Sequence, residues 1–226
     1  MNTIGALFAA WFHPDPARPV LTFYDDETGE RTELSGLTLT NWVAKTANLL
    51  VDGCGLAPGD RAAVLLPAHW QTAAVLLGCW MAGITVDPSG DPAFVTLDRL
   101  GDTRATEVFG LALAPLAAPI RPGPPNGVQD YVLEVRAYGD EYRPAVPATA
   151  TTEALPGVTH GDLCRRAAEV GLTAGARVLV DGDAHPDPVD WLLAPMAAGA
   201  TTVLCRHLDP AAVAGRVAAE RVTATY

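Results

Sequence analysis

The sequence predicts an α/β protein built from two copies of one strand–helix–strand unit. Residues 55–86 return at 171–202 in a fixed register, and 12 of the 31 positions from 55 to 85 are identical at an offset of 116 residues. Each copy holds a glycine turn, an apolar strand, a helix and a second glycine turn. Strands that alternate with helices are typical of a mainly parallel sheet flanked by helices.

The repeat also predicts the domain organisation. We expect two α/β lobes: residues 1–122, which carry an N-terminal helix and a hairpin, and residues 123–226, which carry the second copy. Packing of both lobes as one domain is the alternative. The pattern of apolar and turn residues is less regular between residues 88 and 148, where 121–127 reads Arg-Pro-Gly-Pro-Pro-Asn-Gly and predicts a linker.

Composition limits the class of protein and of partner. The chain has 226 residues, of which 49% are hydrophobic, enough to bury a substantial core. A net charge of -11 argues against nucleic acid, because binding phosphates needs a clustered positive field. The four cysteines have no paired spacing, which favours free thiols and a cytoplasmic location. The apolar run 4–12 is too short for a membrane span.

The elements before and within the first copy follow from apolar periodicity and turn residues. In chain order they are a helix around Leu7 to Phe12 ended by Pro14 and Pro16, strands 20–24 and 31–34 around the turn 26–29, a helix begun by Thr38 or Thr40 and running to 51, strand 61–66, helix 70–81 ended by Gly83, and a strand 84–86.

The later elements are expected from the same signals. In chain order they are a helical turn 97–100, strand 107–113, a hairpin of 131–137 with 141–146, helix 162–170, strand 177–180, helix 189–198, strand 201–205 and helix 210–220.

Several segments resemble the N-terminal part of adenylate-forming (AMP-binding) enzymes, which include acyl-CoA synthetases, luciferases and the adenylation domains of peptide synthetases. The segments are 21–24, 29–35, 56–61, 64–67, 80–86, 157–160, 172–180, 192–204 and 220–223. The chain also resembles small, uncharacterised, stand-alone actinobacterial proteins of this shape. The resemblance implies two α/β subdomains packed side by side.

The family's phosphate loop is only partly matched. That loop is rich in Ser, Thr and Gly and ends in Gly-x-Pro-Lys-Gly, so that its backbone N–H groups and its lysine bind phosphate. Thr151, Thr152, Pro156 and Gly157 match it and are the candidate nucleotide-binding residues. No lysine stands between Pro156 and Gly157, and Glu153 adds a negative charge. We therefore expect no productive ATP binding and no cofactor.

The resemblance also bears on catalysis. The family's adenine-binding motif, ribose-binding aspartate and C-terminal catalytic lysine lie beyond the part that matches, and nothing in this sequence corresponds to them. The hypothesis is therefore a cytoplasmic pseudoenzyme with a binding, scaffolding or regulatory role, as a homodimer or with a protein partner that covers the face left by the missing half. The alternative is a binder of a nucleotide or acyl ligand, or one subunit of a split adenylate-forming enzyme.

One acidic segment contains residue types that bind metals. Asp181, Asp183, His185 and Asp187 alternate after the strand 177–180, where oxygens and one imidazole could face a divalent cation. The alternative is a solvated acidic loop. His185 shares its repeat position with His69, which favours a packing or capping role for both.

Overall fold

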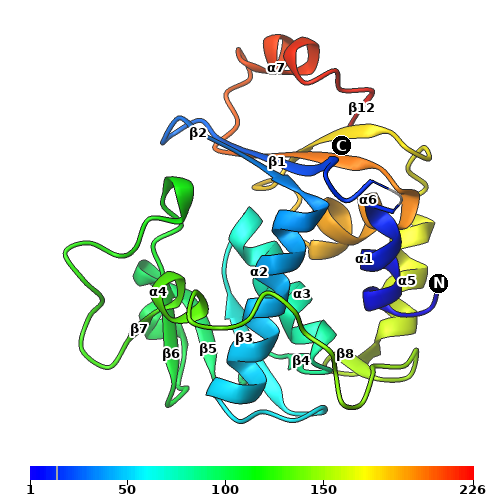
Figure 1. Cartoon of the computed structure of the whole chain (residues 1–226). Coiled ribbons are helices and arrows are strands. Elements are labelled where there is room, and N and C mark those ends of the chain that lie inside the picture. Colours follow the sequence, from blue (N-terminus) through cyan, green and yellow to red (C-terminus); the bar gives the residue numbers. More distant parts are fainter. Residues whose placement is uncertain (14) are drawn as a thin grey trace. The chain divides into compact units, whose positions relative to one another are not determined.

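The computed structural model describes residues 1–13 and 15–226 and divides into two compact units (Figure 1). Unit 1 comprises Met1–Thr38, Pro67–Trp70 and Gly161–Tyr226, and unit 2 comprises Leu39–Leu66 and Gln71–His160. The expected lobes, 1–122 and 123–226, are contiguous, whereas unit 1 draws on both. The physical reason is strand pairing, because an N-terminal strand joins the sheet of the second copy. The predicted role of Pro14 lies outside the described residues.

Unit 1 contains a five-stranded sheet in the order β12-β10-β11-β1-β2. Its strands are β1 (Pro19–Asp25), β2 (Glu30–Ser35), β10 (Arg177–Asp181), β11 (Thr201–Arg206) and β12 (Ala224–Thr225). Four of them run parallel, and only β2 is antiparallel to its neighbour β1. The antiparallel pairing of β1 with β2 confirms the predicted hairpin. Gly29, in its turn, has a φ of 73°, a conformation that favours glycine.

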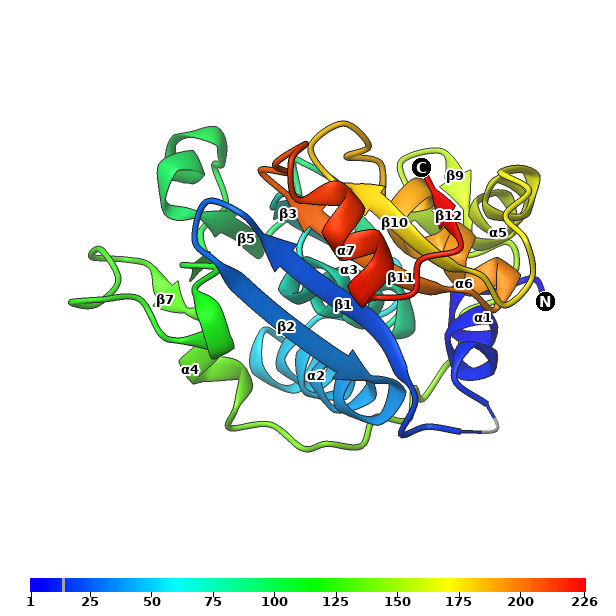
Figure 2. The same cartoon turned by 90° about the horizontal axis from the view of Figure 1, so that it is seen from above.

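Helices cover both faces of this sheet. They are α1 (Ile4–Trp11), α5 (His160–Glu169), the π-helical turn η4 (Val189–Leu193) with α6 (Ala194–Ala198), and α7 (Val213–Ala219). Trp11 is buried, and its indole N–H donates to the carbonyl of Ala200. On the other face, Val217 of α7 packs on Leu179 and Val203, with α7 lying across the strands (Figure 2).

Unit 2 contains a second sheet, entirely parallel, in the order β4-β3-β5-β6-β7. Its elements are β3 (Arg61–Leu65), β4 (Thr85–Val86), β5 (Ala93–Thr96), β6 (Val108–Leu111), β7 (Gln129–Asp130), helix α3 (Trp70–Met81), the 3₁₀ helices η2 (Leu97–Asp102) and η3 (Pro115–Ala117), helix α4 (Tyr131–Val135), and the antiparallel pair β8 (Glu153–Leu155) and β9 (Val158–Thr159). Helix α2 (Gly36–Asn48) leads into it and continues as the π-helical turn η1 (Leu49–Gly53). The predicted α/β class with mainly parallel sheets is confirmed.

The internal repeat is reproduced in the backbone. Strand β3 pairs with β4 through Arg61 and Thr85, and β10 pairs with β11 through Arg177 and Thr201, at the same offset of 116. The hydrogen bonds of the turns also repeat at this offset. They are Asp60 N to Ala57 O and Ala176 N to Thr173 O, Gly83 N to Trp80 O and Gly199 N to Met196 O, Ile84 N to Cys79 O and Ala200 N to Pro195 O, and Thr85 N to Asp60 O and Thr201 N to Ala176 O. Gly83 and Gly199 both adopt left-handed φ and end their helices as expected.

Two local predictions are wrong. Helix α2 begins at Gly36 rather than at Thr38 or Thr40, because Ser35 is the residue whose hydroxyl accepts the backbone N–H of Thr38, at 3.1 Å. The expected hairpin strand 131–137 contains helix α4 instead. Asp130 caps that helix by accepting the backbone N–H groups of Val132 and Leu133.

The four cysteines are free, as expected. Within the described ranges, the helices are too short or too polar to cross a bilayer.

Candidate functional site

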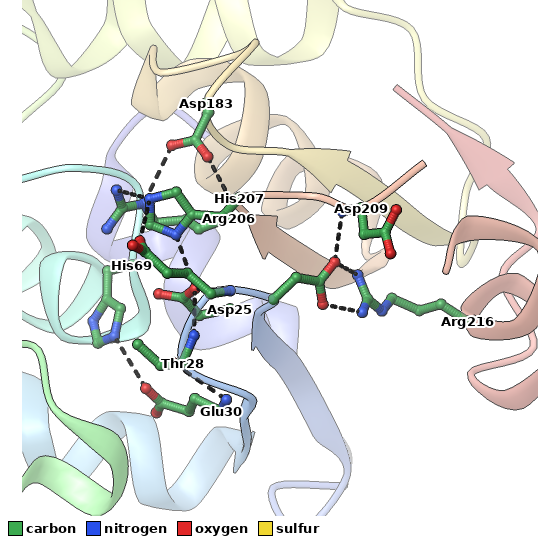
Figure 3. Close-up of polar contacts among 11 residues, drawn as sticks. Asp25, Thr28, Glu30, His69, Asp183, Arg206, His207, Asp209 and Arg216 are labelled. Carbon is green, nitrogen blue, oxygen red and sulfur yellow. Dashed lines mark hydrogen bonds and ion pairs between the residues drawn. The ribbon is translucent and has the colours of Figure 1, made fainter. Parts of the chain in front are cut away.

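Polar side chains gather at the carboxyl edge of the parallel strands of unit 1 (Figure 3). Strand β1 ends at Asp25, β11 ends at Arg206, and the loop after β10 carries Asp183. In α/β proteins this edge is where ligands commonly bind, because the strand ends and their loops converge there. We call Asp25, Asp183, Arg206 and His207 the carboxyl-edge cluster.

His207 is the centre of the carboxyl-edge cluster. Its Nδ1 lies 2.8 Å from Asp25 Oδ1, and its Nε2 lies 3.3 Å from a carboxylate oxygen of Glu27. Its backbone N–H donates to Asp183 at 2.6 Å, and Asp183 also accepts from Arg206 at 3.2 Å. These bonds hold His207 at a φ of 47°, which is uncommon for a residue other than glycine. The loop after β11 is thereby fixed to the turn after β1.

The Asp25 carboxylate is held in its ionised form. Burial alone would raise its pKa, but the hydrogen bond from His207 and those from the backbone N–H groups of Glu27 and Thr28 outweigh burial and lower the pKa. The ionised carboxylate therefore stabilises the fold and is not poised to donate a proton at neutral pH.

We expect Asp25→Asn to lower the free energy of unfolding by about 1–2 kcal/mol at neutral pH, because it weakens charge-assisted hydrogen bonds. A group whose pKa is lowered by folding stabilises the protein above its unfolded value, 3.8, and loses that effect as the pH falls further. Urea unfolding from pH 7 to pH 3 measures this. A difference between the variant and wild type that stays constant over this range would contradict the expectation.

Two neighbouring carboxylates are also engaged. Asp26 accepts hydrogen bonds from both terminal nitrogens of Arg216, at 2.5 and 3.2 Å. The hydrogen bond from Arg216 is the main cause of the lowered pKa of Asp26. Glu30 is buried, lies 3.9 Å from His69 and accepts the indole N–H of Trp70. His69 is itself buried against the ring of Phe23, with ring centres 4.3 Å apart, which is the packing role expected for it. Both carboxylates hold elements of unit 1 together.

The predicted metal residues are directed to separate partners. Asp181 accepts the backbone N–H groups of its own turn, and Asp183 binds Arg206 and His207. His185 lies beside Tyr226, and Asp187 accepts the N–H of Val189 and lies 3.4 Å from Arg166. Within residues 1–13 and 15–226, no three His, Cys, Asp or Glu side chains form a group able to hold a metal.

The segment matched to the phosphate loop is closed by its own groups. Thr152 Oγ1 accepts the backbone N–H of Thr149 at 2.9 Å, and the Thr151 hydroxyl lies 3.1 Å from that of Thr149. The Glu153 carboxylate accepts the backbone N–H of Gly157 at 2.6 Å. Gly157 has a φ of 71° in the turn that joins β8 to β9, and Pro156 precedes it.

The β8–β9 hairpin is fixed to the rest of unit 2. Trp80 Nε1 donates to the carbonyl of Ala154 at 3.1 Å, and the Thr85 hydroxyl donates to the carbonyl of Glu153 at 3.2 Å. The second carboxylate oxygen of Glu153 lies 3.7 Å from Arg61. The Glu153 carboxylate therefore accepts the Gly157 N–H, the donor that the family resemblance assigns to a phosphate.

Unit 2 also has an open hollow of about 500 Å³. Its lining residues are Leu56, Gly59, Asp60, Arg61, Ser89, Gly90 and Asp91. The lining charges already have partners, since Arg61 pairs with Asp87, Asp60 accepts from Ala57, and Asp91 accepts from Thr106. The hollow therefore presents few unsatisfied groups to a ligand.

Only one of the four residues of the carboxyl-edge cluster is a candidate site residue in the sequence. The sequence predicts Asp183 as a metal ligand and assigns no role to Asp25, Arg206 or His207. The sequence does carry a signal for them, because each of the three lies one or two residues beyond the end of a strand that the sequence predicts, 20–24 or 201–205.

Comparisons with known proteins agree with the fold. The sequence model of the family described as AMP-binding enzyme matches residues 8–93. An acyl-CoA synthetase from Brucella canis superposes with a TM-score of 0.73 at 18% identity, covering 100% of this chain and 52% of that chain. The coronafacic acid ligase from Pectobacterium brasiliense gives a TM-score of 0.75 at 10% identity, covering 99% of this chain and 49% of that chain. The chain therefore spans about half the length of these solved structures.

A relative from Mycobacterium tuberculosis (strain ATCC 25618 / H37Rv) matches along nearly its whole length. It is described as a TIGR03089 family protein and is 44% identical over 236 residues, covering 97% of this chain and 96% of the relative. The resemblance to the N-terminal half of AMP-binding enzymes is thus confirmed. Identity at this level over both lengths places the protein: it belongs to the TIGR03089 family, with the fold of the N-terminal half of acyl-CoA synthetases.

Proposed function

We propose that this protein is a non-catalytic relative of AMP-binding enzymes that acts in the cytoplasm by binding a protein, either a second copy of itself or another chain. The observation that supports this most directly is the bond from Gly157 N–H to the Glu153 carboxylate. The backbone donor that the family resemblance assigns to a phosphate oxygen is bonded to a carboxylate of the same loop.

The surrounding groups reinforce that closure. The threonine hydroxyls of the loop bond to one another and to the Thr149 backbone, and Arg61, which lies 3.7 Å from Glu153, also pairs with Asp87. A triphosphate would have to displace Glu153 and would meet no lysine in the loop. The electrostatic balance of the loop therefore disfavours a polyanion.

We expect neither Mg-ATP nor AMP to raise the melting temperature of the wild-type protein. A ligand at about 100 times its Kd adds about 2.7 kcal/mol to the free energy of unfolding, which differential scanning fluorimetry and titration calorimetry detect readily. Glu153→Ala removes the internal carboxylate, and we expect it to gain a small stabilisation by pyrophosphate. Glu141→Ala, at an exposed glutamate of the same unit, is the matched control. A clear shift of the wild type with ATP would refute the proposal.

The second candidate is one subunit of a split adenylate-forming enzyme. It is favoured by the superposition on about half of an acyl-CoA synthetase and half of a coronafacic acid ligase. This candidate requires a separate chain that supplies the remaining half. Carboxylate-dependent exchange of pyrophosphate into ATP, seen only when both chains are mixed, would establish it, and binding without exchange would leave the non-catalytic role.

A further inference from the structure

Strand β2 is the last strand of the unit 1 sheet. The sheet order ends at β2, and in the described part of the chain β2 pairs with β1 alone (Figure 2). It runs for six residues, Glu30–Ser35, without a proline. A terminal strand of this kind exposes backbone N–H and C=O groups along one side, which favours pairing with a further strand.

The two faces of β2 differ in polarity. Glu30 and Leu34 are buried on one face of the sheet. Arg31 and Glu33 alternate with them on the other face, and their side chains are 46% and 37% exposed. A strand added beside β2 would therefore meet one cation and one anion, two residues apart and both partly exposed to solvent.

Both charged groups keep capacity for a further partner. The hydrogen bonds of Arg31 reach Tyr24, Glu33 and Glu220 through Nε and Nη2, and none of them uses Nη1. Those of Glu33 use only Oε2. One guanidinium nitrogen is thus left to donate a hydrogen bond to a neighbouring strand, and one carboxylate oxygen is left to accept one.

We propose that β2 pairs antiparallel with β2 of a second copy of this chain, around a two-fold axis at Thr32. Arg31 of each copy then lies directly opposite Glu33 of the other, which gives two cross-strand ion pairs. This inference deepens the binding role proposed above and rests on it.

The charge pattern also selects the register. When two antiparallel copies share one continuous sheet, only residues that face the same side can lie directly opposite one another. The two-fold axis therefore passes through a residue, and each alternative register moves the axis to the next residue. An axis at Arg31 opposes two arginines, and an axis at Glu33 opposes two glutamates. Only the axis at Thr32 opposes unlike charges at both positions, and a pattern that complements itself in this way indicates a second copy as the occupant.

The net charge of -11 sets the conditions under which the dimer forms. Two copies repel one another over long distances, whereas the paired side chains are in contact. At 0.15 M ionic strength, charges more than about 8 Å apart are largely screened, so the contact pairs dominate. Because one strand edge is a small interface, we expect a dissociation constant in the micromolar range.

The test uses charge-reversed variants of the full chain and light scattering from about 1 to about 100 μM, the range that resolves a micromolar Kd. We expect a wild-type dimer, and we expect Glu33→Arg and Arg31→Glu each to be monomeric, because each opposes like charges. An equimolar mixture of the two variants should dimerise again, since their charges are complementary. This recovery would also show that both variants are folded.

A second measurement does not depend on charge. Thr32→Cys places two thiols at the two-fold axis, where opposite Cα atoms in an antiparallel pair are about 4.5–5.5 Å apart, and should form a disulfide-linked dimer on oxidation. Ser35→Cys, three residues from the axis, should not. A wild type that stays monomeric at the highest concentration, a dimer insensitive to Glu33→Arg, or equal cross-linking of both cysteine variants would overturn the proposal. A monomer that also ignores ATP would leave the non-catalytic role standing, with a different protein as partner.

Discussion

Glu220→Gln is expected to lower the free energy of unfolding by about 3 kcal/mol at pH 7. The Glu220 carboxylate accepts the Tyr24 hydroxyl at 2.5 Å and two nitrogens of Arg31 at 2.9 and 3.1 Å, and it pairs with Arg177. Burial would raise its pKa, but these three partners outweigh burial and lower it from 4.5 to about 2. A shift of this size corresponds to about 3 kcal/mol, because each pKa unit is worth about 1.4 kcal/mol.

The effect of Glu220→Gln has a defined pH dependence. Folding lowers the pKa of Glu220, so its contribution is complete above pH 4.5 and is lost as the pH falls toward about 2. Urea unfolding of wild type and variant at pH 7, 4 and 2.5 measures this loss. Glu169→Gln is the control, since Glu169 and its partner Arg165 are both exposed, and such pairs contribute about 0–1 kcal/mol. Equal losses in the two variants would contradict the assigned role of Glu220.

Trp80→Ala is expected to destabilise the protein by about 3–5 kcal/mol, the usual cost of truncating a buried tryptophan. Trp80, in α3, is 1% exposed, and its indole N–H donates a hydrogen bond to the carbonyl of Ala154 in β8. Loss of the ring leaves a cavity in unit 2 and releases the hairpin that carries Glu153 and Gly157. We therefore expect faster amide hydrogen exchange at Gly157 as well as a lower midpoint of urea unfolding.

Trp80→Phe separates these two effects. It keeps most of the packing and removes only the hydrogen bond, so we expect about 1–2 kcal/mol of destabilisation. Exchange at Gly157 should rise in both variants. If it rises in neither, the contact between Trp80 and Ala154 does not hold the hairpin in place.

The elements that the sequence predicts well are those with long periodic patterns or strong turn residues. Helix 70–81 has the predicted bounds, and Gly83 ends it through its left-handed conformation. Helix α4 could not be read in this way, because a five-residue helix leaves little periodicity. Its formation depends on the Asp130 cap and on the burial of Tyr131 against Phe94, which the sequence does not show.

The candidate site was less accessible to sequence reasoning than the fold. Asp25 and His207 are 182 positions apart and meet only because β1 pairs with β11. That pairing joins a strand from outside the repeat to a strand within it, so the repeat gives no hint of it. The loop 148–157 was different, since the carboxylate of Glu153 was visible in the sequence and only its acceptance of the Gly157 N–H required coordinates.

The two copies of the repeat share one register, but the arginine at the start of the equivalent strands has different partners in each copy. Arg61 and Arg177 begin equivalent strands, 116 residues apart. Arg61 pairs with Asp87 and Glu153, whereas Arg177 pairs with Glu220. At the offset of 116, Asp87 corresponds to Val203 and Glu220 corresponds to Arg104, so neither acid has an acidic counterpart. The repeated arginine thus has a different counter-ion in each copy, so that the same backbone unit carries two chemically distinct environments.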